Sequence, residues 1–267
     1  MNTQAESLFK RYVSGGDHSS NDYLGLIKEL LQLDRNLPDW QKGIDQAYAL
    51  LLQEIEESRE RPAQPISFGT SGWRGRLGKD INARSVVIVT LAIVRMYQTL
   101  DRDDSLAPLL GVASTDEAKR RGCVLGYDNR FAGSVLATKV ASVLSEAGFV
   151  IYFAGESTTG VLSAAVLQRH AAFSINLTPS HNPFEYGGYK FNAADAGPAA
   201  APITEHITAN ARALLEDQLQ SGLFDHHQAA DLLPDSTDFH RVDALGDWLE
   251  LVAANQGSHG LDLPQAV

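Results

Sequence analysis

Ser180 lies between Pro179 and Pro183 in the segment TPSHNP (178–183). Proline fixes the backbone on either side, and a restricted backbone suits a nucleophile that must meet its electrophile in line. Ser180 is therefore the candidate nucleophile. The alternative is an ordinary surface turn, because Pro, Ser and Asn are common turn residues.

Two nearby side chains suit proton transfer. Lys190 follows the paired glycines Gly187 and Gly188, which let the backbone fold back so that the amine returns to the serine segment. His181 is adjacent to Ser180 in the chain. Taken singly, a lysine after a glycine-rich turn is more often only solvated, and a loop histidine more often only hydrogen-bonds. The two residues are candidates because they accompany Ser180, and Lys190 is also a candidate phosphate-binding residue.

The segment FGTSGWRG (68–75) has the composition of an anion-binding turn. Its glycines expose backbone amides, and the planar guanidinium of Arg74 can bind phosphate oxygens in pairs. The other candidate phosphate-binding residues in the turn are Thr70, Ser71 and Gly72. The segment fits neither nucleotide-binding glycine pattern, which disfavours a nucleotide-binding protein. An ordinary tight turn is the alternative.

The segment GYDNR (126–130) follows an apolar run, so Arg130 is expected at the carboxyl end of a strand. Ser180 follows another such run and should lie at the same edge of the sheet. Arg130 is then a second candidate phosphate ligand. The competing interpretation is a structural salt bridge between Asp128 and an arginine.

From residue 66 onward, short apolar strands alternate with helices, a pattern that predicts a parallel α/β sheet. The expected strands are 66–68, 124–127, 150–153 and 172–177, and the expected helices are 83–100, 132–147, 161–170 and 203–219. The candidate residues fall in loops beyond strand ends, where ligands gather in such folds. We expect a three-layer α/β/α domain with a mixed, mostly parallel sheet.

Helical periodicity at 21–33 and 37–59 predicts an N-terminal helical extension covering residues 1–62. The α/β/α domain is expected to cover residues 63–222. Residues 223–267 are expected to form a linker, rich in Asp and His at 225–238, and the start of a truncated second domain, with a helix at 241–254.

Composition excludes several classes of protein. The chain has 267 residues, 44% of them hydrophobic, which is enough to bury a core. A formal net charge of −11 argues against a nucleic-acid partner. The single cysteine, Cys123, lies in an apolar run and is expected to be a buried thiol. The apolar stretch 86–94 is too short to span a bilayer and no signal peptide is visible, so we expect a cytoplasmic protein without a membrane partner.

Four segments occur in order: FGTSGWRG, GYDNR, TPSHNP and GGYKFN (187–192). Together they resemble the first domain of the α-D-phosphohexomutases, a family that includes phosphoglucomutase and phosphomannomutase. The resemblance runs from about residue 66 to residue 219. It implies that Ser180 is carried as a phosphoserine and that His181 and Lys190 assist proton transfer. It also implies that Arg74 and Arg130 line the reaction centre.

The activity implied by the resemblance is intramolecular phosphotransfer between a hexose 1-phosphate and a hexose 6-phosphate. A hexose 1,6-bisphosphate is the implied intermediate and activator, and Mg²⁺ is the implied cofactor, with the Ser180 phosphate as one oxygen ligand. The family commonly has alanine where Pro179 stands, and the proline form resembles some phosphoglucomutases, which favours glucose over mannose. The alternatives are a phosphoglucosamine mutase and a non-catalytic phosphosugar-binding or interaction module.

Three parts of the family's active site have no counterpart in this sequence: the metal-binding D-G-D-x-D-R loop, the sugar-recognition loop and the C-terminal phosphate-binding domain. The chain is therefore expected to be a fragment, inactive by itself, whose partners are the phosphosugar and the remaining domains of the enzyme. The acidic segment 101–104 precedes the serine motif and is interpreted as a solvated helix end.

Overall fold

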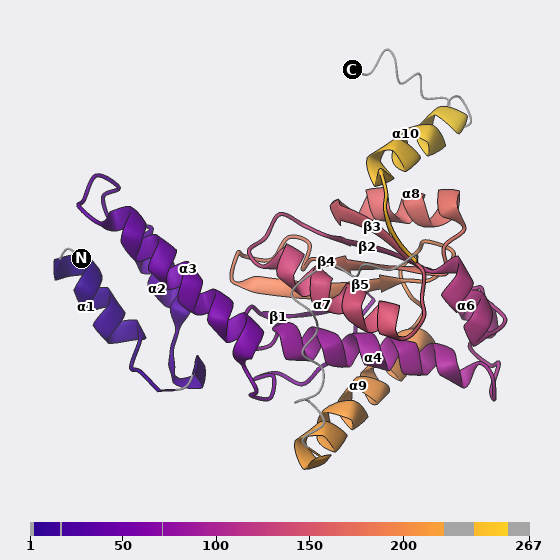
Figure 1. The fold of residues 1–267 in the computed structure, drawn as a ribbon, viewed down its shortest axis with the longest axis horizontal. Coiled ribbons are helices and arrows are strands. Elements are labelled where there is room, and N and C mark those ends of the chain that lie inside the picture. Colours follow the sequence, from indigo (N-terminus) through magenta and orange to yellow (C-terminus); the bar gives the residue numbers. More distant parts are fainter. Residues whose placement is uncertain (1–2, 17, 71, 222–237, 256–267) are drawn as a thin grey trace.

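The computed structural model describes residues 3–16, 18–70, 72–221 and 238–255. The chain begins with an extension of helices that lies beside the sheet domain (Figure 1). Its elements are α1 (Thr3–Tyr12), the 3₁₀ helix η1 (His18–Ser20), α2 (Tyr23–Leu30) and α3 (Trp40–Glu57). Apolar residues at helical spacing, such as Ile27 and Leu51, are buried between α2 and α3. The predicted helical extension is present.

A buried charge joins the extension to the sheet domain. Lys79, in the loop after β1, pairs with Glu54 of α3. The Lys79 ammonium also donates to the backbone oxygens of His18 and Asn21, at 2.8 Å each. Glu54 is only 2% exposed, and burial raises the pKa of its carboxyl even though Lys79 acts in the opposite direction. Because an unpaired buried charge is costly, this contact fixes the extension against the domain.

The strands of the described residues form one six-stranded sheet in the order β1-β5-β4-β2-β3-β6. They are β1 (Trp73–Arg76), β2 (Cys123–Tyr127), β3 (Ile151–Glu156), β4 (Phe173–Leu177), β5 (Tyr186–Asn192) and β6 (Phe239–Arg241). β4, β2, β3 and β6 are parallel to one another, and β5 runs antiparallel between β1 and β4. The sheet is mixed and mostly parallel, as predicted.

Helices cover both faces of this sheet (Figure 1). The helices are α4 (Ala83–Thr99), α5 (Ala107–Leu110), α6 (Thr115–Arg121), α7 (Gly133–Glu146), α8 (Thr159–Arg169), α9 (Ala201–Ser221) and α10 (Ala244–Ala254). Side chains alternate along β2: Cys123 and Leu125 join the core beneath α4 and α7, whereas Val124 packs with Leu162 and Val166 of α8 on the other face. This confirms the three-layer α/β/α architecture and the buried Cys123 thiol.

One expected strand is absent from the structure, and the sheet contains strands that were not expected. Residues 66–68 form no strand; the first strand is β1, which lies after the glycine-rich turn. Ile66 is buried and the Phe68 amide donates to Thr208 of α9, so this segment packs on a helix. The antiparallel strand β5 was not predicted, because its paired glycines interrupt the apolar run expected of a strand.

At the C-terminal end, the helix predicted at 241–254 begins at Ala244, where Asp243 accepts a hydrogen bond from the Gly246 amide. The residues before it form β6, which pairs with β3 of the main sheet. The linker predicted at 225–238 lies outside the described residues except for Asp238. The domain boundaries remain predictions.

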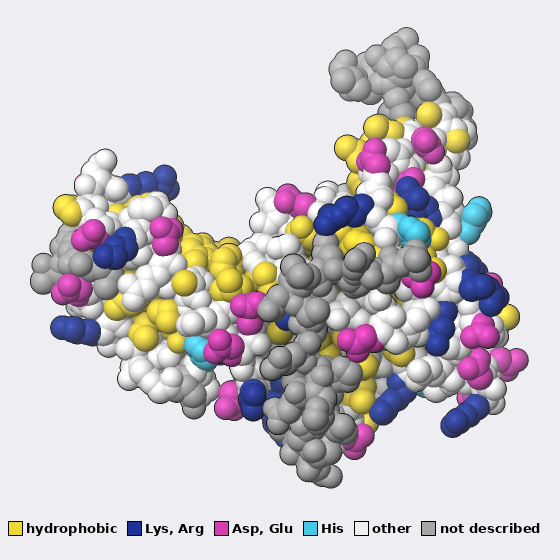
Figure 2. All heavy atoms as spheres, viewed as in Figure 1, with side chains coloured by type: hydrophobic (Ala, Val, Ile, Leu, Met, Phe, Trp, Pro, Cys, Tyr) yellow, Lys and Arg dark blue, Asp and Glu magenta, His cyan; other side chains and the backbone are white. Residues whose placement is uncertain are grey.

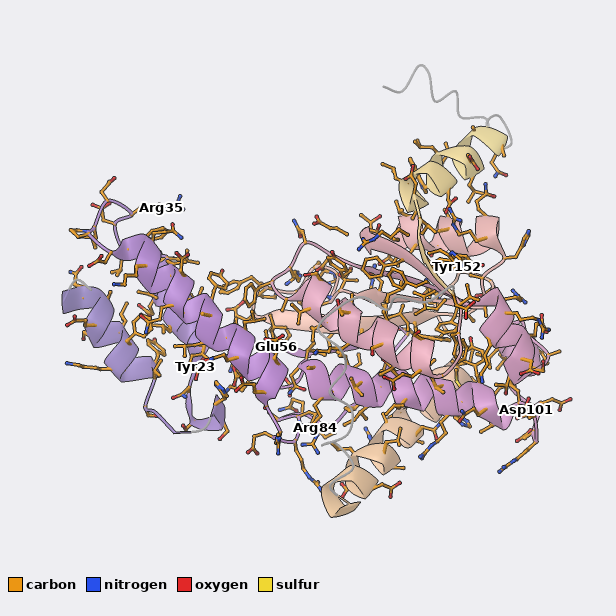
Figure 3. All side chains as sticks on the ribbon, in the orientation of Figure 1. Tyr23, Arg35, Glu56, Arg84, Asp101 and Tyr152 are labelled. Atoms are coloured by element: carbon orange, nitrogen blue, oxygen red, sulfur yellow. The ribbon has the colours of Figure 1, made fainter. Side chains whose placement is uncertain are left out.

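The acidic segment 101–104 lies beyond the end of α4 and is exposed, as expected of a solvated helix end. Asp101 lies at the far end of α4 from the N-terminal extension (Figure 3). Charged side chains of both signs are scattered over the face shown in Figure 2. Over the described part of the chain, no helix combines the length and apolar character needed to cross a membrane.

Candidate active site

Ser180 is the third residue after the end of β4 and is exposed. Its φ is 76°, in the left-handed region, where a residue other than glycine is about 1–2 kcal/mol less stable. The backbone amide of Ser180 donates to the Thr178 hydroxyl at 3.0 Å. The serine is thus presented to solvent in a backbone conformation that its surroundings must maintain.

Three residues maintain that conformation, and we call them the loop clasp: Asp128, Arg130 and Thr178. The Thr178 hydroxyl donates to Asp128 Oδ2 at 2.6 Å. Asp128 in turn accepts from Arg130 Nε at 3.2 Å and from the Arg130 amide at 3.1 Å. A continuous set of hydrogen bonds therefore connects the end of β2 with the Ser180 amide.

The other end of the Arg130 side chain holds the serine loop itself. Its Nη2 donates to the backbone oxygen of Asn182 at 2.5 Å, and its Nη1 donates to those of Pro183 at 2.6 Å and Tyr186 at 3.3 Å. A guanidinium has five N–H donors, so these contacts and the one to Asp128 leave a single N–H. The competing Asp128 salt bridge is present, and phosphate binding by Arg130 remains a prediction.

Arg74 and Lys190 form the cationic side of the site. β1 and β5 pair so that Arg74 lies opposite Gly188, two residues before Lys190. Arg74 Nε is buried without a hydrogen-bond partner. Burial and then the charge of Arg74 lower the pKa of the Lys190 amine, against the opposing effect of Asp128. Two cations this close, one with a free donor, favour an anion between them.

The glycine-rich turn is fixed against β5. Gly69 and Gly72 exchange backbone hydrogen bonds of 3.1 and 3.0 Å. Gly72 has a φ of 88°, and a Cβ there would clash with the backbone oxygen of Tyr189. Thr70 is exposed in this turn, whereas Ser71 lies outside the described residues. Phosphate binding by this turn remains a prediction.

Ser180 lines a cavity of about 560 Å³ beyond the carboxyl ends of β2, β3 and β4. The other lining residues are Asp128, Asn129, Arg130, Glu156, Ser157, Thr158, Thr159, Asn176 and Thr178. His181 is exposed beside Ser180 in the chain. Glu156, Thr159 and Asn176 were not predicted from the sequence. Their signal was position alone, because each lies at or near the carboxyl end of β3 or β4.

The described residues contain no cluster of three or more His, Cys, Asp or Glu side chains that would hold a metal ion. The carboxylate nearest the serine loop, Asp128, is already paired with Arg130. Mg²⁺ binding with the Ser180 phosphate as one ligand remains a prediction.

Fold and site together define an α/β/α domain that presents a serine on a clasped loop after β4, with the cations Arg74 and Lys190 on the adjacent strands β1 and β5. The family model for "Phosphoglucomutase/phosphomannomutase, alpha/beta/alpha domain I" matches residues 65–218. The chain belongs to this family, the α-D-phosphohexomutases, whose members are mutases of the isomerase class. The N-terminal extension lies outside the matched residues.

Individual relatives agree with that assignment. Phosphoglucosamine mutase of Synechococcus sp. (strain WH7803) is 29% identical over 185 residues, which are 69% of this chain and 35% of the relative. A crystal structure from Thermus thermophilus, described as a phosphomannomutase, has a TM-score of 0.53 at 24% identity and covers 73% of this chain and 37% of its own. Pp63/parafusin of Paramecium, in its open form, has a TM-score of 0.51 at 16% identity, with 76% and 38% covered. The structures support the fold, and the chain spans about a third of the length of these relatives.

Proposed function

We propose that this chain is the phosphoryl-carrying domain of a hexose phosphate mutase, with Ser180 as the residue that bears the phosphoryl group. The observation that carries the proposal is the exposed Ser180, held at φ 76° by the loop clasp at the edge of an open cavity. A nucleophile fixed in this way loses little freedom on reaction, which lowers the barrier to in-line transfer.

The proposed reaction begins with transfer of the phosphoryl group from Ser180 to the hexose monophosphate. A hydroxyl oxygen of the hexose monophosphate attacks the phosphorus of phosphoserine 180, and the bond between phosphorus and Ser180 Oγ breaks. The hydroxyl proton passes to a base, and Ser180 Oγ receives a proton. The product is the hexose 1,6-bisphosphate, which returns its other phosphoryl group to Ser180 after turning over in the site.

Lys190 and His181 are the proposed proton carriers. The lowered pKa of Lys190 supports this role, because a larger share of its amine is neutral near neutral pH than in a free lysine. Arg74, with its unpartnered buried Nε, is the proposed phosphate ligand, and the Thr70–Gly72 turn is proposed to add backbone contacts. Such donors stabilise the charge that spreads over the phosphoryl oxygens during transfer.

Mg²⁺ is the proposed cofactor, bound through the phosphate on Ser180. A divalent metal neutralises charge on the transferring group, and the Ser180 phosphate is the one oxygen ligand that we assign to it here. Its other ligands are proposed to lie outside the described residues.

Two sugars are supported. Pro179 in the serine loop favours glucose, because the proline form resembles some phosphoglucomutases. Relatives named as phosphoglucosamine mutases give comparable support to glucosamine. Mannose is the remaining candidate within the proposal, in keeping with the family description.

The test uses glucose 1,6-bisphosphate labelled with ³²P and mass spectrometry of the treated chain. We expect phosphate on Ser180 and no labelling of Ser180→Ala. Phosphate only on other residues, or normal labelling of Ser180→Ala, would contradict the proposal. An unlabelled but correctly folded chain would favour the second candidate, a phosphosugar-binding or interaction module.

A further inference from the structure

The cavity beside Ser180 has a wall, formed by Glu156, Thr159 and Asn176, that the proposed phosphoryl transfer does not use. Thr159 is the first residue of α8, Asn176 lies in β4, and Glu156 ends β3. We propose that this wall is a subsite for the hydroxyl groups of the sugar. The inference rests on the proposed function, because it names what the cavity beside the phosphoryl carrier binds.

The hydrogen bonds around Thr159 leave its own proton free to donate. Its Oγ1 accepts from Asn176 Nδ2 at 3.0 Å and lies 3.4 Å from the Lys190 ammonium, which also donates. Two donors occupy both lone pairs of the hydroxyl, so its O–H points to a further acceptor. Thr159 is half-buried and lines the cavity. A hydrogen-bond acceptor on a ligand in the cavity would accept the proton of Thr159.

Asn176 brings an unmet acceptor to the same wall. Its residue is only 3% exposed, and its Oδ1 is buried without a hydrogen-bond partner. If the amide is turned over, Thr159 donates its proton to Oδ1, and the unpaired group is Nδ2, a donor. Either orientation leaves one end of the amide for a ligand, because buried polar groups in proteins are normally paired. Only a group that both donates and accepts satisfies both orientations.

The hydrogen-bonding groups of the wall distinguish a hydroxyl from a phosphate. Glu156 is an exposed carboxylate, which accepts hydrogen bonds and repels anions. The cavity lining carries one cation, Arg130, whose guanidinium is committed to the loop clasp and the loop carbonyls. The Lys190 ammonium reaches the wall at Thr159, so the discriminating property is the type of hydrogen bond. A phosphate only accepts and leaves Glu156 and Asn176 Oδ1 without a donor, whereas a sugar hydroxyl donates to Glu156 and accepts from Thr159. The wall therefore suits the sugar, and the phosphoryl group belongs with Arg74 and Lys190.

The test compares equilibrium binding of glucose 1,6-bisphosphate and hexane-1,6-diol bisphosphate to the 267-residue chain, followed by amide chemical shifts. The second compound carries both phosphates on six carbons but no hydroxyls. We expect the sugar bisphosphate to bind about 10-fold more tightly and Asn176→Ala to reduce this ratio by about 3- to 10-fold, as for one or two lost hydrogen bonds. Flexibility of the diol affects every variant equally, so the change in the ratio reports the hydroxyl contacts.

Two further variants complete the design. Glu156→Ala removes an exposed side chain and leaves the backbone pairing of β2 with β3 intact. It should reduce the ratio of the affinities for the sugar and the diol bisphosphates, and it provides a test even if Asn176→Ala folds poorly. Asn192→Ala is the matched control: Asn192 is a buried asparagine of the neighbouring β5 that bonds Ser163 and Ala196 outside the cavity. It should keep the wild-type ratio.

Equal binding of the two bisphosphates by the wild-type chain, or a ratio that neither cavity variant changes, would overturn the subsite. Labelling of Ser180 by glucose 1,6-bisphosphate is measured in parallel. A labelled serine with equal binding refutes the subsite alone. An unlabelled serine with a clear preference for the sugar refutes the phosphoryl carrier and leaves the subsite standing. Absence of binding by both compounds refutes the subsite whatever the labelling.

Discussion

Replacing Arg130 by lysine tests whether this residue holds the serine loop or binds the phosphate. Lysine keeps the charge, but its three donors lie on one nitrogen and cannot reproduce the spread of contacts to Asp128 and to the oxygens of Asn182 and Pro183. We expect the loss of about two hydrogen bonds, each worth about 0.5–1.5 kcal/mol net. The variant should therefore be less stable by about 1–3 kcal/mol.

The same change should slow the labelling of Ser180. Without the clasp, the loop is free to release the left-handed backbone of Ser180, whose cost is about 1–2 kcal/mol, so the reactive geometry becomes a minor state. A penalty of that size lowers the single-turnover labelling rate by about 5- to 30-fold. Rapid quench with labelled bisphosphate measures the rate, and denaturant unfolding measures the stability.

Arg169→Lys is the matched control. Arg169 is also part-buried and pairs through two donors with Asp247, at 2.7 and 2.9 Å, but it joins α8 to α10 away from the serine loop. It should lose similar stability and label normally. Equal labelling rates in the two variants would refute the clasp as a positioning device. Slow labelling of Arg130→Lys with unchanged amide shifts in the serine loop would instead support direct phosphate contact, and our reasoning on the donors would be wrong.

Three further changes have defined outcomes. Lys79→Met should destabilise the chain by about 3–5 kcal/mol at neutral pH by leaving Glu54 unpaired. Because burial raises the Glu54 pKa, this loss of stability should shrink as the pH falls and the carboxyl is protonated. Adding Glu54→Gln to Lys79→Met should recover stability in urea melts at neutral and at acidic pH. Gly188→Ala would place a Cβ within 2.7 Å of two backbone atoms of the serine segment and should abolish labelling, whereas Gly160→Ala, with nothing within 4 Å, should label normally. Since the Lys190 pKa is lowered, the labelling rate of Ser180 in the wild-type chain should rise with pH toward that pKa, and Lys190→Met should lack this rise. Identical pH profiles of the labelling rate in the two proteins would exclude Lys190 as the proton acceptor.

The apolar runs of the sequence predicted half of the strands in the sheet, the adjacent β4, β2 and β3. The strands β2, β3 and β4 lie within one to three residues of their predicted ends, because strands buried on both faces read as continuous apolar segments. β1 and β5 did not follow this rule. They pair antiparallel around Gly75 and Gly187, and that pairing is long-range, so neither segment carries a local strand signal.

The residue types at the site were also visible in the sequence, since Ser180, Lys190 and Arg74 lie in short motifs whose chemistry is local. Their partners were not. Arg130 was expected to bind phosphate, and only the approach of residues 182–186 to the end of β2 showed that its donors are occupied by loop carbonyls. Likewise, Thr159 and Asn176 are 17 residues apart and meet only because β3, α8 and β4 converge at one edge. The sequence by itself determined which groups can react, and the tertiary structure decided which are free to do so, because hydrogen-bond donors and acceptors are committed by contacts between distant segments.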